Sequence, residues 1–467
     1  MKMRRRDFLA MPAVVAAPRA TDARLDEIRT EFQDFLYRAP YKFGGKEVDR
    51  VTLLNVHCRV SAKSGKSAAG FASMPLGNVW AFPAPDIPYE TTLAAMRALS
   101  EKVARILRGY REYAHPLDAN RALEPEFLKA AEETTREMAL PRPIPKLCTL
   151  VTASPFDAAL HDAFGRLHGR NAFTACGKEF VRYDLSHYLN ADFRGEYLDP
   201  FLLRSPVPRI RMYHSVGASD ALTAAEIRKP VGDGLPETLE EWIPYNGVVA
   251  IKIKLNGNDL GWDVERVASI DRVTVAAQAR RGVREWLYCL DFNERCPNVQ
   301  YLLDFERGVR TRAASAFGRV QYIEQPTARD LAADRRNTMF EAARLKPVVI
   351  DESLTGLDAL LLAREMGYTG VALKACKGQS QALLMAAAAQ KYKMFRCVQD
   401  LTCPGAALVH SVGIAAHVPG AGALEANARE YVPAANRGWE KRFPGIFEVR
   451  DGFMRTRGLD APGLCTS

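Results

Sequence analysis

Several short apolar runs in the C-terminal half of the chain each end in a charged residue. The five clearest runs end, in chain order, at Lys254, Asp291, Glu324, Asp351 and Lys374. An apolar run bounded by polar sequence is typical of a strand buried on both faces, and the stretches between these runs are long enough for crossover helices. The alternation predicts a parallel β/α barrel. Because the active face of such a barrel is at the carboxyl ends of its strands, the five charged side chains are expected to meet at one mouth.

The chain is longer than such a barrel, which takes about 250 residues, so its 467 residues predict a second domain. The eight expected barrel strands cover residues 209–214, 248–254, 286–291, 319–324, 347–351, 370–374, 394–399 and 421–425. The expected domains are a leader with a lead-in helix, a capping domain with an insertion at 170–207, the barrel and a C-terminal segment, at 1–45, 46–207, 208–430 and 431–467.

The sequence before the barrel predicts a mixed α and β domain. Strands are expected at 51–60 and near 78–82, and helices within 88–140. A helix is expected from Ser154 to His168, with Ser154 as its cap and Pro155 in its first turn, because apolar residues recur there at helical spacing.

Composition excludes several classes of protein. No apolar stretch approaches the roughly 20 residues that span a bilayer, so stable membrane insertion is not expected. The net charge is +9, but the lysines and arginines are scattered among acids, which argues against a nucleic-acid partner. The positive surplus is compatible with a small anionic substrate. We also expect a homo-oligomer.

The cysteines and the N-terminus bear on the compartment. Nine cysteines without C-x-x-C pairs predict buried free thiols rather than a disulfide framework or a zinc site. Arg4-Arg5-Arg6 followed by Phe8-Leu9 and a short apolar segment resembles a twin-arginine export signal, which would make the protein periplasmic. The alternative is a cytoplasmic protein with a basic N-terminus.

Two lysines share one face of the strand expected at 248–254. Period-2 alternation places Lys252 and Lys254 on the same side as Ala250, and therefore inside the barrel. Mutual repulsion and burial would lower their pKa values from about 10.4 toward those of a general base. The alternative is an edge strand with two solvated lysines.

Three acids follow successive strands and would lie side by side on the rim. Asp291, Glu324 and Asp351 offer carboxylate oxygens without His or Cys among them, a donor set that suits Mg²⁺. Taken singly, each acid could equally be a helix cap or a solvated loop residue. Lys374 would face the other lysines across the mouth, and Lys377 is expected in the following loop.

The ordered set of motifs resembles the enolase superfamily, in particular its branch of mandelate racemase and muconate lactonizing enzyme. The similar segments are Lys252-Ile253-Lys254, Asp291-Phe292-Asn293, Ile323-Glu324-Gln325-Pro326, Asp351-Glu352-Ser353 and Lys374-Ala375-Cys376-Lys377-Gly378. The resemblance covers residues 47–467. It implies an α/β protein built as a modified (β/α)8 TIM-like barrel, with an N-terminal α+β capping domain that the C-terminal segment completes.

The resemblance also implies a reaction. Mg²⁺ bound by residues 291, 324 and 351 would hold a substrate carboxylate and stabilise the enediolate formed when the α-carbon loses its proton. Lys254 and Lys374 would act as base and acid on opposite faces, with Lys252 as an electrostatic partner of Lys254. Two opposed lysines favour a racemase or epimerase, whereas one is enough for a sugar-acid dehydratase or a cycloisomerase.

Some motifs of the family are absent. Gln399-Asp400 stands where the mandelate racemase subgroup has a histidine, and Glu425-Ala426-Asn427 replaces the D-x-D of dipeptide epimerases. Gly378 is not followed by a second glycine. Glu425 is expected to be structural, although it could donate to a substrate carboxylate if protonated. His214 and His417 are expected to be core or rim residues.

Two other functions remain open from the sequence. One is a Schiff-base aldolase on an ordinary barrel, with a lysine as nucleophile, although the three acids argue against it. The other is an exported, metal-stabilised binding protein that keeps the fold without turnover. Ligand binding that survives the loss of Lys254, without proton exchange, would identify the second.

Overall fold

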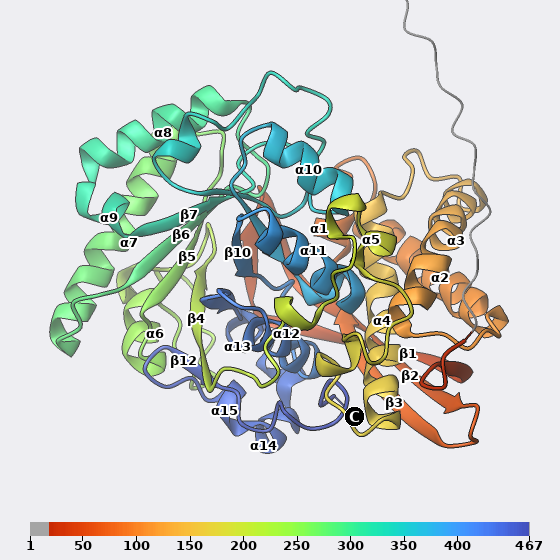
Figure 1. The fold of residues 1–467 in the computed structure, drawn as a ribbon. Helices are drawn as coiled ribbons and strands as arrows, with labels where there is room; N and C mark the ends of the chain where they lie inside the picture. Colours follow the sequence, from red (N-terminus) through yellow and green to blue (C-terminus); the bar gives the residue numbers. More distant parts are fainter. Residues whose placement is uncertain (1–17, 467) are drawn as a thin grey trace, which may run out of the picture.

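The computed structural model describes residues 18–466, which form two separate β-sheets. One is a three-stranded antiparallel sheet near the N-terminus, and the other is a closed barrel. Figure 1 shows the barrel with its outer helices beside a smaller unit that contains the three-stranded sheet and α2 to α4. The twin-arginine motif falls in residues 1–17, outside the described residues, and stays a prediction.

The small sheet begins with a long hairpin. Strand β1 (Ala23–Phe43) pairs with β2 (Lys46–Ala62) through a turn at Gly44 and Gly45, which both have positive φ. Strand β3 (Ser67–Pro75) pairs with the other edge of β2. The predicted strand at 51–60 is therefore confirmed. The expected lead-in helix before residue 45 is wrong, because the segment pairs with β2 across the hairpin.

The three long helices of this unit are α2 (Tyr89–Gly109), α3 (Pro116–Glu137) and α4 (Lys146–Leu167). The predicted strand near 78–82 is wrong, since Asn78–Ala81 form the single turn α1. Helix α4 begins eight residues before the predicted cap, and Pro155 lies inside it. The helix tolerates this proline because Ser154 Oγ donates to Val151 O, the carbonyl that a residue-155 amide would have used.

The barrel has eight parallel strands, and all eight predicted strands are confirmed. In chain order they are β4 (Arg209–Val216), β5 (Ala250–Lys254), β6 (Leu287–Asp291), β7 (Val320–Glu324), β8 (Val348–Ile350), β9 (Gly370–Leu373), β10 (Phe395–Val398) and β11 (Ala423–Glu425). Each pairs with the next in sequence, and β11 pairs with β4 to close the barrel. Strand β12 (Phe453–Arg455) adds to β4 in the antiparallel sense.

Helices surround the barrel as the repeating pattern predicted. They are α6 (Leu239–Asn246), α7 (Leu260–Arg281), α8 (Val299–Arg312), α9 (Ala314–Arg319), α10 (Leu357–Glu365), α11 (Gln379–Lys391) and α12 (Ala406–His417). The connection from β7 to β8 has only the short turn η5 (Ala342–Arg344). Other single turns are η1 (Thr174–Cys176), α5 (Leu185–Tyr188), η2 (Ala191–Phe193), η3 (Asp199–Phe201), η4 (Ala224–Glu226) and η6 (Ala375–Lys377).

The C-terminal residues contact both the barrel and the N-terminal unit. After α13 (Ala428–Tyr431) the chain forms the short turns η7 (Pro433–Asn436), α14 (Trp439–Arg442) and α15 (Pro444–Phe447). Near its end, Leu464 N donates to Asp162 Oδ1 of α4 at 2.7 Å, and Ala172 N donates to Gly463 O at 2.9 Å. The last described residues thus lie against α4.

The inner face of the barrel carries one apolar side chain from each of the eight strands. This floor consists of Tyr213, Ala250, Cys289, Tyr322, Val349, Ala372, Cys397 and Ala423, all at most 4% exposed. The two tyrosines fill the space that the small residues leave. The floor closes the barrel below the mouth, so the interior is packed rather than a pore.

Two further observations concern the chain as a whole. All nine cysteines are buried free thiols, as predicted. Among the described residues there is no helix with the length and apolar character needed to cross a membrane.

We predict that Gly70→Ala destabilises the protein by about 2 kcal/mol, because an added methyl group overpacks a close contact. A Cβ at Gly70 on β3 would lie 2.3 Å from Ala159 O of α4. The midpoint of urea unfolding would report the loss. Gly109→Ala is the matched control, since nothing lies within 4 Å of its added Cβ. An unchanged midpoint for Gly70→Ala would show that the sheet and α4 separate without cost.

Candidate active site

A ring of polar side chains stands directly above the apolar floor. Each of the eight strands places a polar residue two positions after its floor residue, and alternation turns that residue inward as well. The ring consists of Ser215, Lys252, Asp291, Glu324, Asp351, Lys374, Gln399 and Glu425, each at most 5% exposed. Polar groups therefore converge at the carboxyl ends of the strands, directly above the apolar floor.

Lys252 is the centre of this ring. Its Nζ donates to Glu324 Oε1 at 3.0 Å, to Gln399 Oε1 at 3.0 Å and to Glu425 Oε2 at 2.9 Å. Asp291 Oδ2 lies 3.0 Å from the same nitrogen. One fully buried ammonium group is thus shared by three carboxylates.

Asp291, Glu324 and Asp351 lie at the ends of neighbouring strands and form what we call the acid row. The other lysines contact its two ends. Lys254 Nζ donates to Asp291 Oδ2 at 2.6 Å, on one side. On the other side, Lys374 Nζ lies 2.9 Å from Asp351 Oδ2, and Lys377 Nζ donates to Asp351 Oδ1 at 3.0 Å. Lys377 follows the strand in the turn η6, as predicted, but its side chain is buried at the mouth. The lysines and acids form one continuous charged cluster.

The predicted lowering of the lysine pKa values is wrong. Burial is the largest single effect and lowers the pKa of Lys252. The charges of Asp291 and Glu324, with that of Glu425, together outweigh burial, so the pKa lies well above its ordinary value. The pKa values of Lys254 and Lys374 are raised for the same reason. The sequence argument counted burial and lysine repulsion, whereas the folded chain brings a carboxylate against every ammonium group.

The three acids of the predicted metal site differ from one another. Burial, with the nearby charge of Asp291, raises the pKa of Glu324 well above its ordinary value. For Asp291 and Asp351 burial acts in the same direction, but the lysines outweigh it and both pKa values are lowered. Glu324 Oε2 is buried and has no hydrogen-bond partner.

Neighbouring groups hold the acid row in place. Gln325 Oε1 accepts the backbone N–H of Asp351 at 2.8 Å, so the residue after one acid orients the next strand end. Asn293 N donates to Asp291 Oδ1 at 2.8 Å. From α4, Asp157 accepts Ser380 N and Ser380 Oγ, both at 2.7 Å, at the start of α11 just after Lys377. The N-terminal unit therefore fixes the loop that carries the lysines.

Aromatic residues from the N-terminal unit cover the mouth. Trp80 of α1 lies over Lys374, with Nζ 4.3 Å from the ring centroid, and its Nε1 donates to Glu352 Oε1 at 2.8 Å. The ring centroid of Phe43, at the tip of the hairpin, lies 5.7 Å from Lys254 Nζ. These residues had no distinctive signal in the sequence, because only folding brings their strand and turn over the barrel.

Two further acids at the mouth were missed as site residues by the sequence analysis. Glu352 follows Asp351, and burial, with the charge of Asp351, raises its pKa to about 7. Asp400 follows β10, and burial, with the charge of Glu425, raises its pKa to about 8. Both positions lie beside strand ends, and strand-end acids are the signal by which they could have been found.

The residues about which the sequence left alternatives are now located. Glu425 belongs to the ring and contacts Lys252. His214 points away from the barrel interior, with Nδ1 2.8 Å from Glu430 Oε1. His417 is buried and stacked on Phe173 with ring centroids 4.1 Å apart, so it is a core residue, as expected.

The chemistry of the acid row fits a divalent cation. It supplies three carboxylates, of which two buried oxygens, Glu324 Oε2 and Asp351 Oδ2, accept no hydrogen bond, although the second is ion-paired with Lys374. In residues 18–466, however, no three His, Cys, Asp or Glu side chains are arranged to hold an ion. Ammonium groups lie between the acids instead, so a cation would have to replace lysine contacts that now neutralise the same charges.

We predict that Lys252→Met destabilises the metal-free protein by about 3–5 kcal/mol near pH 8, because it leaves buried carboxylates without a counter-charge. The raised pKa of Lys252 keeps its contribution constant below about pH 10 in the parent protein. In the variant the acids take up protons as the pH falls, so the deficit shrinks toward about pH 5. Urea unfolding in chelator would measure both values.

Lys346→Met serves as the control for that substitution. Lys346 is half-buried, its Nζ donates to the backbone of Gly318 and lies 5.0 Å from the Phe317 ring centroid, so its loss should cost about 1 kcal/mol or less. An equal cost for the two variants would contradict the shared-ammonium arrangement.

Comparison with known proteins places these features in a family. Residues 235–467 match the family described as enolase C-terminal domain-like. No curated protein matches the chain significantly.

Solved structures share the fold over nearly the whole chain. Muconate lactonizing enzyme from Pseudomonas fluorescens is 15% identical, with a TM-score of 0.60 over 96% of this chain and 97% of that one. A mandelate racemase/muconate lactonizing protein from Herpetosiphon aurantiacus is 18% identical, with a TM-score of 0.63 over 95% and 98%.

A third similar structure is the dipeptide epimerase from Enterococcus faecalis V583, complexed with Mg and the dipeptide L-Leu-L-Tyr. It is 12% identical, with a TM-score of 0.61 over 94% of this chain and 99% of that one. The family match and the shared barrel and cap agree with the motif order found in the sequence. The chain belongs to the enolase superfamily, in the branch of mandelate racemase and muconate lactonizing enzyme.

Proposed function

We propose that the protein is an Mg²⁺-dependent enzyme that removes the α-proton of a small carboxylate substrate, as a racemase or epimerase. The observation that carries this proposal is the position of the lysines. Lys254 contacts one end of the acid row at Asp291, and Lys374 contacts the other end at Asp351. A substrate held above the row would have an ammonium group at each side.

The acid row is the proposed metal site. Asp291, Glu324 and Asp351 would hold the ion, which when bound supplies positive charge for a substrate carboxylate and for the negative charge that develops beside it. Because the ion would take up the charge of these carboxylates, they would no longer raise the lysine pKa values as they do in the metal-free protein.

Each lysine then has a distinct task. Lys254 or Lys374, when neutral, takes the α-proton at its Nζ from one face, and the other lysine returns a proton at its own Nζ to the opposite face. Lys252 stays protonated because it remains against Glu425 as well as the acid row. Trp80 and Phe43 cover the mouth. Over a bound substrate, these two side chains would exclude water from the reacting carbon.

We predict Mg²⁺-dependent exchange of deuterium from D₂O into the α-position of a carboxylic acid. A library of sugar acids, N-acylated amino acids and dipeptides would be screened by NMR. Lys254→Ala and Lys374→Ala should each abolish racemisation, since each removes the proton carrier of one face. Lys393→Ala, in the turn after α11, is the control and should retain full activity.

The same variants separate the alternatives. A dehydratase or a cycloisomerase needs one lysine, so one of the two variants would keep product formation. A non-catalytic binding protein would bind a carboxylate ligand without exchange in any variant. A Schiff-base aldolase would instead be trapped by borohydride in the presence of substrate.

Metal binding has a readout that does not depend on turnover. We predict that saturating Mg²⁺ raises the thermal unfolding midpoint, since a ligand at about 100 times its dissociation constant adds about 2.7 kcal/mol. Glu324→Gln and Asp351→Asn should lose this shift. Glu306→Gln is the control, because Glu306 is a buried acid on α8, outside the ring. A shift that persists in the ring variants would remove the acid row as the metal site.

We also propose that the arginine motif at residues 4–9, with the short apolar segment after it, directs export by the twin-arginine route. Fractionation of a cell that expresses the full chain, with Arg5→Lys/Arg6→Lys as the comparison, would test this. A cytoplasmic parent protein would contradict it.

A further inference from the structure

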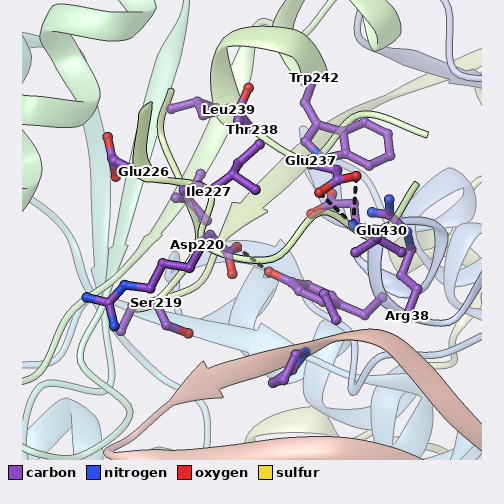
Figure 2. A pocket seen from close by; sticks show the side chains of 18 of the residues that line it. Arg38, Ser219, Asp220, Glu226, Ile227, Glu237, Thr238, Leu239, Trp242 and Glu430 are labelled. Carbon is purple, nitrogen blue, oxygen red and sulfur yellow. Dashed lines mark hydrogen bonds between the residues drawn. The ribbon is translucent and has the colours of Figure 1, made fainter. Parts of the chain in front are cut away.

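A cavity of about 930 Å³ lies beside the first barrel strand, on the same face of the barrel as the mouth. Its walls come from the edge of β1, the outward side of β4, the loop at 217–238, the first turns of α7, and α13. Figure 2 shows side chains from these segments directed around one open space. The loop at 217–238 is a βα connection, the part of a barrel that commonly forms binding sites.

The cavity is separated from the charged ring by a tyrosine wall. Tyr41 packs on Tyr431, with ring centroids 4.3 Å apart, and its hydroxyl shares a hydrogen bond of 2.9 Å with Ser215 of the ring. Tyr431 lines the cavity on the other side. On β4, His214 and Val216 face the cavity while Ser215 faces the barrel. None of the six predicted catalytic and metal residues lines this cavity.

Most acids of the cavity wall are already paired. Asp220 Oδ2 accepts Gly217 N at 2.7 Å and the Tyr431 hydroxyl. Glu237 Oε1 accepts the backbone N–H groups of Val231 and Gly232, both at 2.9 Å. These carboxylates are therefore held by the protein itself and offer little to a ligand.

The two remaining paired acids follow the same rule. Glu226 accepts Leu222 N at 3.2 Å, and Glu430 lies 2.8 Å from His214. Burial raises the pKa of Glu430 and that of Asp220. Glu47 is the one lining acid without a hydrogen bond or ion pair among the described residues.

The positive side chains of the wall are less committed. Arg228 and Lys229 are exposed and make no hydrogen bond or ion pair within residues 18–466. Arg266 donates through Nη2 to the carbonyls of Gly217 and Asp220, but its Nε is buried without a partner. Arg38 is paired with Asp233. The uncommitted charge that faces the cavity is thus mainly positive.

The same wall has an apolar component, in which Ile227 and Trp262 are half-buried and Trp242 and Leu239 are buried. Trp242 and Trp262 line the cavity with Ile227 and Leu239. Indole rings in the same cavity wall as free guanidinium and ammonium groups suit a ligand that combines a flat apolar body with an acidic group. A cationic ligand would meet Arg228 and Lys229 without a compensating pair of free acids.

We propose that this cavity is a second binding site, separate from the acid row, for a small anion with a flat apolar body. Its anionic group, a carboxylate, sulfonate or phosphate, lies against Arg228 and Lys229, and its body lies against Ile227 and Trp262. The site requires neither the metal nor the proposed proton transfer, so its test stands apart from theirs.

The test uses naphthalene sulfonate as the probe, with the neutral naphthalene methanol and the cationic naphthylmethyl ammonium as comparisons. Calorimetry and tryptophan fluorescence would measure binding to the full chain in chelator. The sulfonate should bind about tenfold more tightly than the cation, a difference of about 1.4 kcal/mol, and its affinity should fall as salt screens the charges. Equal or tighter binding of the cation would overturn the proposal.

Variants locate the probe. Arg228→Ala/Lys229→Ala should weaken sulfonate binding about tenfold. Both residues are exposed and unpaired, so the fold should be unaffected. Arg284→Ala/Lys441→Ala is the control, because it removes two exposed positive charges that do not line the cavity. The affinity should stay within about twofold, the level expected of a distant charge.

A further variant distinguishes the cavity from the acid row. Lys254→Ala should also leave sulfonate affinity within about twofold, because Lys254 lies beyond the tyrosine wall. Loss of binding in Lys254→Ala, with no effect of Arg228→Ala/Lys229→Ala, would mean that the probe occupies the acid row, and the second site would be rejected.

Discussion

The alternation of side chains along eight parallel strands is the constraint on which the site depends. Because a strand repeats every two residues, an inward apolar residue such as Ala250 is followed by an inward polar one such as Lys252. The same step occurs on all eight strands, so an apolar floor closes the barrel and a polar ring stands upon it. A shift of one strand by a single residue would turn its polar group into the surrounding hydrophobic core.

Burying so many charges is tolerated only because they neutralise one another. Lys252 is shared by three carboxylates, and Lys254 and Lys374 bind the outer ends of the row. Any one of these groups alone in the same place would carry a large desolvation cost. The cluster therefore has a dual character: its internal pairs stabilise the metal-free fold, and they occupy the oxygens that a cation would use. A reaction at the mouth would change the same balance of positive and negative charges.

Much of this arrangement could be predicted from local patterns. Five apolar runs that end in charged residues indicated the repeat from which all eight barrel strands were predicted, and the inward direction of Lys252 and Lys254 followed from period 2. Predictions failed where a contact outside the local apolar pattern decides the structure. The segment that forms β1 was expected to contain a lead-in helix but pairs with β2 over most of its length. Helix α4 continues through Pro155 because a serine hydroxyl takes the freed carbonyl. The lysine pKa values moved upward because carboxylates from other strands face them.

The sequence by itself determined the barrel, the family and the identity of the charged residues, because each depends on short periodic patterns and on the order of motifs along one chain. The tertiary structure alone decided what surrounds those residues. Trp80 and Phe43 reach the mouth from a separate sheet, and Tyr41 joins Ser215 across 174 positions to divide the mouth from the cavity beside β4. Such contacts depend on how two units pack, and packing between distant segments leaves no periodic signal in the sequence.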